Sequence, residues 1–434
     1  MTTTDQNEDR FLKSGDEAGT PPGDRSFRPD IQGLRALAIG LVVLYHAGVP
    51  GISGGYVGVD VFFVISGYVI TGLLLRERAR SDKTSLLHFY GRRARRILPA
   101  STIVIVLTVI AAFHFLGFLS GGEVASDAQS AALFVANFHF ISLGTNYASA
   151  QSPPSPLQNF WSLAVEEQFY FVYPTLFLLT AILVRRVSLA AKLIAVLVLI
   201  TVASYVWCIL QTHSNATAAY FSPFTRAWEL SLGSLVAIVA PCSRRLPSAR
   251  IAAILTWVGL LAIIVSAFAF DKSTSFPGAI DMLPVGGTAL LIWAGTQAPR
   301  FAAEDLLKLP PLQWLGLISY SLYLIHWPVL TIYTEDRSIP PSLGIKLLLV
   351  VASVVLSIVC YLAVENPLRH SKRLRARPFL SVALVPLCIG ISLGTIAVAR
   401  NANGLPAFSI NHGHPDTPLS AQSAMNRKDE GHST

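Results

Sequence analysis

The sequence predicts an all-α fold, a polytopic bundle of about eleven transmembrane helices. Of the 434 residues, 52% are hydrophobic and 13% are charged, and the mean hydropathy is +0.53. Soluble domains carry about 25% charged residues. Apolar runs of roughly 17–25 residues, the length at which a helix crosses a bilayer, recur from one end of the chain to the other. We therefore expect one multi-pass membrane domain with polar tails.

The expected spans follow one another along the whole chain. They lie at 31–49, 56–75, 98–119, 161–184, 189–211, 224–241, 251–270, 279–297, 313–333, 342–364 and 378–399. The fourth and tenth are impure, because WSLAVEEQFYFVYP and YLAVENP carry carboxylates. The stretch 120–159 contains neither Lys nor Arg and ends near the turn-rich SAQSPPSP. We expect it to form an outside loop, re-entrant or not, that packs against the bundle.

The basic residues indicate how the bundle is oriented. Most of the 33 Lys and Arg residues fall in the N-terminal tail and in alternate loops, and such residues collect on the cytoplasmic side. The N-terminus is therefore expected in the cytoplasm and, with an odd number of spans, the C-terminus outside. The same placement explains the net charge of +8 without a nucleic-acid partner.

The two ends of the chain are expected to be disordered tails. Residues 1–27 are polar and acidic, without an apolar signal region, and are predicted to lie in the cytoplasm. Residues 400–434 are polar and are predicted to lie outside. The cysteines show neither pairing nor metal-ligand spacing and are expected to be small core residues. They are Cys208, Cys242, Cys360 and Cys388.

The first span, IQGLRALAIGLVVLYHAG, carries two ionisable residues. Arg35 and His46 are separated by about three helical turns, so they lie on nearly one stripe, about 16 Å apart along the axis. An ionisable side chain in a bilayer costs roughly 2.5–3.5 kcal/mol, so its presence needs a reason. A neutral imidazole in the outer third of the span could be a general base for a hydroxyl arriving from outside. The alternative is a core histidine bonded to a neighbouring helix, and Arg35 on the same stripe favours function.

An RRARR run precedes the third span on the cytoplasmic side. Its arginines are Arg92, Arg93, Arg95 and Arg96. Guanidinium groups bind phosphates bidentately, so the run could bind a cytoplasmic donor with several phosphates, such as coenzyme A. The alternative is that it only sets topology and contacts anionic lipid.

Two adjacent carboxylates, Glu166 and Glu167, begin the fourth span near the outer interface. Neighbouring residues point about 100° apart on a helix, so at least one of the two is expected to face protein, where it could orient a His or Arg. The alternative is an interfacial carboxylate without a further role. Tyr170, Tyr173 and Trp161 nearby are expected to form an aromatic belt.

Further polar residues lie within other spans. Arg226 and Glu229 are three apart on one helix face and are expected to pair with each other. Asp60 and Ser66 flank the glycine-rich entry into the second span, where close helix packing is expected.

His326 and Trp327 stand near the end of the ninth span, in ISYSLYLIHWP. The predicted topology puts this end outside, on the same side as His46. The two imidazoles could therefore share an external vestibule.

Six motifs occur together, in order, over roughly residues 27–370. They are FRPDIQGLRALAIGLVVLYHAG, GGYVGVDVFFVISGYVIT, FYGRRARRILPA, NFWSLAVEEQFYFVYP, ISYSLYLIHWP and VENP. In these motifs the chain resembles the acyltransferase-3 family of integral-membrane O-acyltransferases. The resemblance implies an enzyme of the bacterial inner membrane that transfers acyl groups other than aminoacyl groups. Acetyl or another short acyl group would move from cytoplasmic acyl-CoA, with acetyl-CoA first among the donors, to a hydroxyl of a cell-surface glycan or lipid-linked saccharide, for instance in lipopolysaccharide.

The resemblance also implies roles for individual residues. The Arg-x10-His motif of the family is matched by Arg35 and His46 as the catalytic pair. Its Arg-x-x-Arg element is matched twice, in the two overlapping registers of the RRARR run, and both stay open as acyl-CoA ligands. The carboxylate of the fourth-span motif corresponds to Glu166 or Glu167. No metal is implied.

One departure concerns the C-terminal end. Family cores usually have ten spans, and members with an eleventh commonly continue into an external SGNH-type esterase-like domain. Here 28–370 is the expected acyltransferase core, 371–399 is a basic loop with an extra helix, and 400–434 has no Gly-Asp-Ser nucleophile block. The chain would either deliver acyl groups directly or rely on a separate esterase-like partner.

Two other classes of function compete with the enzyme. A transporter of a glycan, lipid or acyl donor would also need buried charges, but it predicts internal repeats, and none is evident in the sequence. A scaffold for envelope assembly leaves the stripe of Arg35 and His46 unexplained.

Overall fold

The computed structural model describes residues 28–81, 84–144, 154–182, 187–241, 248–271, 273–297, 301–337 and 340–408. Within these ranges every regular element is a helix. The elements are α2 Pro29–His46, η1 Gly55–Val57, α3 Gly58–Ser81, α4 Leu86–Phe115, α5 Gly117–Ala132, α6 Ala136–Gly144, α7 Phe160–Ile182, α8 Leu189–Ser214, α9 Ala216–Phe221, α10 Pro223–Val239, α11 Ala249–Ala269, η2 Ala279–Asp281, α12 Met282–Gly295, α13 Ala303–Leu307, α14 Pro310–Leu317, α15 Ser319–Glu335, α16 Leu343–Cys360, η3 Tyr361–Glu365, α17 Asn366–His370, α18 Lys372–Ala376, α19 Pro378–Val382 and α20 Leu384–Ala402. The expected tail 1–27, most of the tail 400–434 and Cys242 lie outside the described residues, and the other three cysteines are buried and free.

The helical class predicted from composition is confirmed. Six helical segments of the described chain are long and apolar enough to cross a membrane, and a seventh is added if α14 and α15, bent by 68°, form one broken span. The chain is therefore a multi-pass membrane protein. Each of the eleven expected ranges coincides with one or more helices, but the number of spans and the orientation of the two termini stay predictions.

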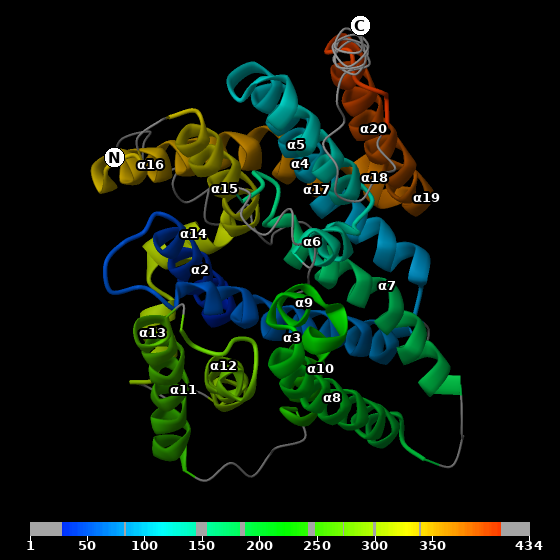
Figure 1. Ribbon diagram of the computed structural model, residues 1–434. Helices are drawn as coiled ribbons and strands as arrows, with labels where there is room; N and C mark the ends of the chain where they lie inside the picture. Colours follow the sequence, from blue (N-terminus) through cyan, green and yellow to red (C-terminus); the bar gives the residue numbers. More distant parts are fainter. Residues whose placement is uncertain are drawn as a thin grey trace, which may run out of the picture.

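Helices α2 and α3 lie in the middle of the bundle, with α14 and α15 on one side and α10 and α12 on the other (Figure 1). Glycine permits the close packing of α3. A Cβ on Gly67 would lie 1.8 Å from the carbonyl oxygen of Leu230 in α10, and one on Gly58 would lie 2.3 Å from that of Ala38 in α2. Backbone-to-backbone contact of this kind fixes the depth at which the polar residues of α3 lie.

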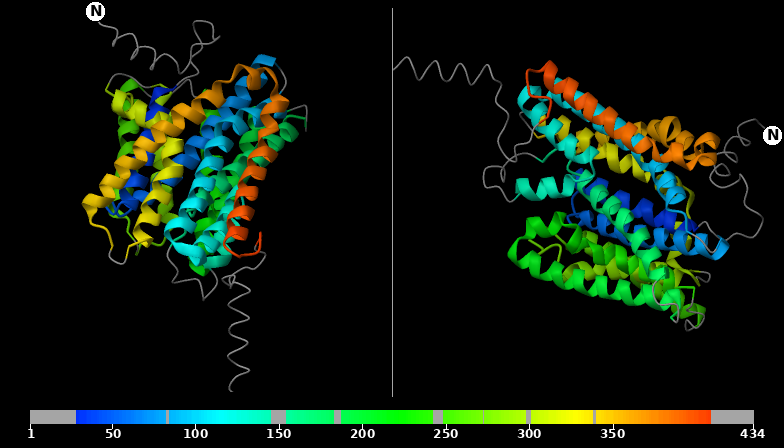
Figure 2. Two further views of the ribbon diagram at one scale, coloured as in Figure 1. Left: turned by 90° about the horizontal axis from the view of Figure 1, so that it is seen from above. Right: turned by 90° about the vertical axis from the view of Figure 1, so that its right-hand side faces the viewer.

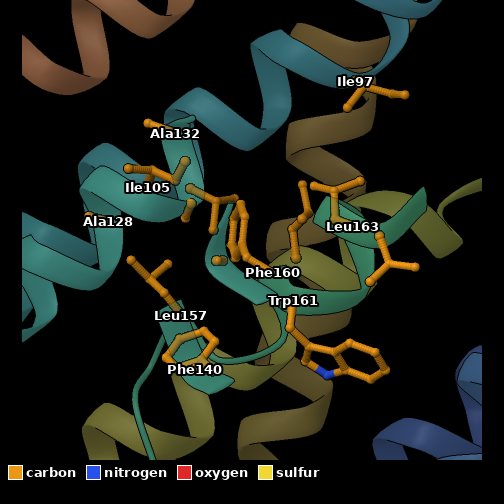
Figure 3. Close-up of a cluster of buried hydrophobic side chains, with 14 of the residues drawn as sticks. Ile97, Ile105, Ala128, Ala132, Phe140, Leu157, Phe160, Trp161 and Leu163 are labelled. Carbon is orange, nitrogen blue, oxygen red and sulfur yellow. The ribbon is translucent and has the colours of Figure 1, made fainter. Parts of the chain in front are cut away.

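The stretch 120–159 was expected to be an outside loop packed against the bundle, but most of its residues up to Gly144 belong to two helices, α5 and α6. Helix α5 folds back beside α4, and a Cβ on Gly121 would lie 2.5 Å from the ring of Phe113. Figure 3 shows the apolar cluster that results, in which Ala128 and Ala132 of α5 lie near Ile105 of α4. The small residues of α5 give little hydropathy, but they allow the close approach that stabilises the helix.

The C-terminal helix α20 packs along α4 and α5 at the edge of the bundle (Figure 2). Arg400, near its end, is buried and donates hydrogen bonds to the carbonyl oxygens of Pro406 at 2.6 Å and Gly122 at 3.0 Å. The hydrogen bond to Gly122 holds α20, the extra C-terminal helix, against α5. Its remaining face exposes Leu387, Ile391 and Val398, as a lipid-facing surface would.

A π-helical turn, η3, follows α16 directly. Glu365 at its end is buried and accepts a hydrogen bond from Ser321 of α15 at 2.9 Å. Single π-turns often occur at functional sites because they rotate a side chain out of the regular helical order. Here the turn brings a carboxylate into the electrostatic neighbourhood of Arg35 in α2.

Candidate active site

A cavity of about 810 Å³ opens at the end of the bundle that carries His46, called the His46 end below. Its wall is rich in aromatic rings, and among the described residues no Asp, Glu, Lys or Arg lines it. The rings are those of Tyr45, His46, Tyr56, Trp161, Tyr220, Phe221, Phe276, Tyr323 and Trp327. Pockets of this size, mostly apolar with a few polar groups, are typical of sites for small molecules.

His46 is the last residue of α2 and is half-buried in the cavity wall. Its Nδ1 lies 3.0 Å from Nε2 of His326 in α15, and the two rings are inclined by only 15°. The ring of Trp327 lies 4.3 Å from that of His46, measured between centroids. The structure thus brings His46 of the first expected span together with His326 and Trp327 of the ninth.

Hydrogen bonds hold the start of α7 against α15. The amide of Asn159 donates to the carbonyl oxygen of Tyr323 at 2.7 Å, and the indole of Trp327 donates to that of Ser155 at 2.8 Å. Trp161 follows directly and is fixed in the wall of the cavity. Figure 3 shows its indole at the edge of the apolar cluster, turned away from the other labelled side chains.

A buried ionic group lies behind this wall. Nη1 of Arg226 is 2.8 Å from a carboxylate oxygen of Asp60 and 3.0 Å from one of Glu229, so the expected pair within α10 forms. A third carboxylate, Asp281 of η2, lies 3.3 Å away and was not anticipated. All four side chains are at most 1% exposed.

Arg226 occupies the place that a bound cation would take among these carboxylates. Asp60, Glu229 and Asp281 have the spacing of metal ligands, but their oxygens surround the guanidinium. The guanidinium carbon also lies 5.1–5.6 Å from the ring centres of Trp161, Tyr220 and Phe276. Cation–π contacts of this kind are favourable, so the group stabilises the aromatic wall.

Ser66 of α3 and Glu166 of α7 meet in the middle of the bundle. Ser66 Oγ donates to Oε1 of Glu166 at 2.6 Å, and the hydroxyl of Tyr170 donates to the same oxygen. The guanidinium carbon of Arg93 lies 3.8 Å from the centre of the Tyr170 ring. Glu166 also interacts electrostatically with Arg35. The carboxylate therefore links α2, α3 and α7.

Arg35 lies about three turns from His46 along α2, in a second ionic group. The members of this arginine group interact electrostatically with one another and are Arg35, Arg93, Arg96, Arg369, Glu166, Glu167 and Glu365. The four arginines are half-buried, so solvent reaches them. None of their guanidinium groups donates a hydrogen bond to another described residue. Their N–H groups thus have no described acceptor, although the Arg93 guanidinium packs on the Tyr170 ring.

The two overlapping Arg-x-x-Arg registers separate in space. Arg93 and Arg96 belong to the arginine group. Arg92 instead forms an ion pair with Glu77 at 2.7 Å, and Arg95 donates hydrogen bonds at 2.6 Å and 3.0 Å to the segment that leads to α20. A shift of one residue rotates a helical side chain by about 100°, which explains the different surroundings.

Sequence reasoning missed two members of these groups, Arg369 and Asp281, and it placed Tyr170 in an aromatic belt, whereas Tyr170 is buried and bonded to Glu166. Arg369 stands four residues after Glu365, a spacing that puts both on one helix face, and Tyr170 stands four after Glu166. Asp281 is a lone carboxylate in an otherwise apolar run. These residues and spacings can be read from the sequence, but their contacts with residues of other helices cannot.

Comparison with known proteins gives one family. Residues 28–362 match the family model Acyl_transf_3, described as an acyltransferase domain. The chain is 32% identical over 359 residues to "Peptidoglycan O-acetyltransferase OatA" of Listeria monocytogenes, an alignment that covers 80% of this chain and 56% of that protein. It is 32% identical over 405 residues to "Putative peptidoglycan O-acetyltransferase YrhL" of Bacillus subtilis, with 89% and 63% covered. It is 31% identical over 366 residues to "O-acetyltransferase OatA" of Staphylococcus aureus, with 82% and 59% covered. The chain thus spans less than two thirds of the length of these relatives, and no solved structure matches it.

Proposed function

This chain belongs to the acyltransferase-3 family, and from that membership we propose that it moves an acetyl or other short acyl group from cytoplasmic acyl-CoA to a hydroxyl of a cell-surface glycan. Because the relatives are named for peptidoglycan O-acetylation, an amino-sugar glycan is the acceptor to test first, and a lipid-linked saccharide is the second. The enzyme would work in the bacterial cytoplasmic membrane, with the arginine group toward the cytoplasm. One observation carries the proposal: a single helix, α2, joins a cationic group to an aromatic cavity about 16 Å away.

The arginine group suits the phosphates of coenzyme A. Four guanidinium groups face three carboxylates there, so one positive charge is in excess when all are ionised. Phosphates would supply the missing negative charge and accept bidentate hydrogen bonds from the free guanidinium groups. The long pantetheine arm could then follow α2 toward His46, past the pair of Ser66 and Glu166. Arg35, at the entry to this path, would bind or orient the donor.

The cavity suits a sugar. Aromatic rings bind the apolar faces of a sugar ring, while a small number of polar groups orient its hydroxyls. The volume of about 810 Å³ lies within the range of roughly 300–1,000 Å³ that holds a drug-sized ligand. The uncharged lining favours a neutral saccharide at the reacting position over a phosphate or a sugar acid.

The reaction needs a base at the acceptor end. Two courses fit the position of His46. In the first, His46 takes the proton of the sugar hydroxyl while the hydroxyl oxygen attacks the thioester carbonyl. The C–S bond then breaks, and the departing thiolate takes up a proton. In the second, His46 attacks the thioester carbonyl, the C–S bond breaks and the departing thiolate takes up a proton; the sugar hydroxyl then takes the acyl group from the ring, and its proton passes to the released imidazole. Both courses convert one thioester and one alcohol into one ester and one thiol.

Purified protein and labelled acetyl-CoA provide the test. We expect acceptor-dependent release of free CoA and transfer of the label to a peptidoglycan fragment. A transporter would move its substrate without releasing CoA, and an assembly scaffold would do neither. Absence of acceptor-dependent CoA release with every glycan tested would overturn the proposal. Mass spectrometry of surface glycans from a deletion strain would identify the acylated position.

A further inference from the structure

His326 of α15 is fully enclosed, with 0% of its surface exposed, yet both of its ring nitrogens are paired. Nδ1 lies 2.8 Å from the main-chain carbonyl oxygen of Leu322, and Nε2 lies 3.0 Å from Nδ1 of His46. A carbonyl oxygen can only accept a hydrogen bond. In neutral His326 the proton is therefore on Nδ1, and Nε2 presents a lone pair toward His46. No described carboxylate contacts either ring, so nothing compensates a charge on this enclosed pair.

The lone pair of His326 determines which ring nitrogen of His46 carries the proton. Nδ1 of His46 must carry a proton to donate to it, and a neutral imidazole has only one N–H. The ring centres lie 5.2 Å apart, nearly the 3.0 Å between the two nitrogens plus the distance of each nitrogen from its own ring centre, so this hydrogen bond runs close to both ring planes, where the lone pair points. Nε2 of His46 is then unprotonated. It makes no hydrogen bond to a described residue, and His46 lines the cavity.

We propose that His326 is a positioning residue that holds His46 in the tautomer whose free Nε2 faces the cavity. The proposal rests on the proposed function for the reaction that this nitrogen serves. When Nε2 takes a proton from the acceptor hydroxyl, the charged ring keeps its Nδ1–H bond to His326, which shares the charge. Hydrolytic triads use a carboxylate for this purpose. A neutral imidazole bonded to a carbonyl oxygen orients the base in the same way, and it leaves the resting site uncharged within an apolar bundle.

The other titratable groups near the pair are three tyrosines and one lysine. They are Tyr45 of α2, Tyr56 of η1, Tyr323 of α15 and Lys346 of α16, whose Nζ lies 3.6 Å from the position of a Cβ on Gly48. Tyrosine and lysine ordinarily titrate near pH 10, whereas imidazole titrates near pH 6.5. A change of activity on the acidic side of neutrality would therefore not come from these tyrosines or from this lysine.

The first test compares His326→Phe with His326→Gln in the acyl-transfer assay. Phe fills the space but offers no acceptor, so we expect kcat to fall on the order of 10²-fold with little change in either KM. Gln can present an amide oxygen to Nδ1 of His46 and should retain more activity than Phe. Thr331→Val on the same helix is the matched control, because Thr331 bonds only the carbonyl oxygens of its own helix. The acidic limb of the pH profile should move in the Gln variant and stay in place in the control.

The second test does not depend on acyl transfer. Diethyl pyrocarbonate reacts with an unprotonated ring nitrogen, and peptide mass spectrometry locates the product. In the wild type we expect modification at His46 and none at His326, and His326→Phe should slow the reaction at His46 several-fold. Modification of His326, or equal reactivity of His46 in the wild type and in His326→Phe, would overturn the proposal. If no variant transfers acyl groups but this reactivity pattern holds, the proposed function fails and the positioning role stands.

Discussion

Replacement of Arg93 and Arg96 together by alanine should weaken donor binding and leave acceptor binding unchanged. Both side chains belong to the arginine group, are half-buried, and donate no hydrogen bond to the rest of the described chain. A hydrogen bond that involves a charged group contributes about 1.5–3 kcal/mol, so two such contacts with donor phosphates amount to about 3–6 kcal/mol. Each 1.36 kcal/mol is a factor of ten, so the KM for acyl-CoA should rise by roughly 10²- to 10⁴-fold.

The other register provides a control with the same change of charge. Arg92→Ala with Arg95→Ala also removes two cations from the same helix. Arg92 loses only a partly exposed ion pair with Glu77, which contributes about 0–1 kcal/mol. Arg95 loses hydrogen bonds to the segment before α20, so this double variant should melt at a lower temperature. Its KM for the donor should stay within a few-fold of the wild type.

Initial-rate measurements compare the two double variants by their KM values for donor and acceptor. Labelled acetyl-CoA is varied at fixed acceptor and the acceptor is then varied at fixed donor, with size-exclusion chromatography in detergent to establish that each variant is folded. An equal rise of donor KM in both double variants would mean that the run acts only through its charge. An unchanged donor KM in the variant lacking Arg93 and Arg96 would remove the arginine group from the donor site.

Four further predictions concern separate parts of the molecule. His46→Gln should lower kcat by about 10²- to 10⁴-fold at unchanged melting temperature, measured as acceptor-dependent CoA release; near-normal turnover would exclude His46 as base or acyl carrier. Trp161→Ala should raise the acceptor KM several-fold and leave the donor KM unaltered, as a ring that stacks on the sugar requires. Gly67→Ala should lower the melting temperature, because its Cβ would lie 1.8 Å from a carbonyl oxygen of α10, whereas Gly40→Ala, with nothing within 4 Å of its Cβ, should not. Burial raises the pKa of Glu304, in the short helix α13 outside the spans, from 4.5 to about 7. The folded protein therefore holds this proton more tightly than the unfolded chain, its contribution to stability is lost as pH rises through that range, and Glu304→Gln should reduce the accompanying fall in melting temperature.

The sequence predicted those features of the fold that depend on the residue pattern within a single helix. Apolar runs gave the helical class, and spacing placed Arg35 and His46 on one stripe, because both depend only on the geometry of a single helix. The stretch 120–159 does pack against the bundle as expected, but the prediction of a loop was wrong for residues 120–144, which are mostly helical. Its glycines and alanines have weak hydropathy, and its helices are stabilised by packing against α4, which is a tertiary effect.

Contacts between helices could not be predicted in this way. The RRARR run contains two overlapping registers of the same spacing, and only the positions of η3 and α7 decide that Arg93 and Arg96 face the carboxylates. The pairing of His46 with His326 likewise depends on how α15 packs beside α2. In both cases the residues were identified from the sequence, while their partners depend on the packing of helices far apart in the chain.

The arginine group and the ionic group around Arg226 differ in solvent exposure and in charge balance, and these differences indicate different roles. Unbalanced charge in an apolar surrounding is unfavourable unless a partner compensates it. The arginine group has more guanidinium groups than carboxylates and its arginines are only half-buried, as the proposed anionic donor requires. Around Arg226 three carboxyl groups surround one guanidinium, all four side chains are at most 1% exposed, and the guanidinium already occupies the centre. The packing of α3 against α10 encloses that group, so its contribution is to stabilise the aromatic wall of the cavity in which we propose that the acceptor binds.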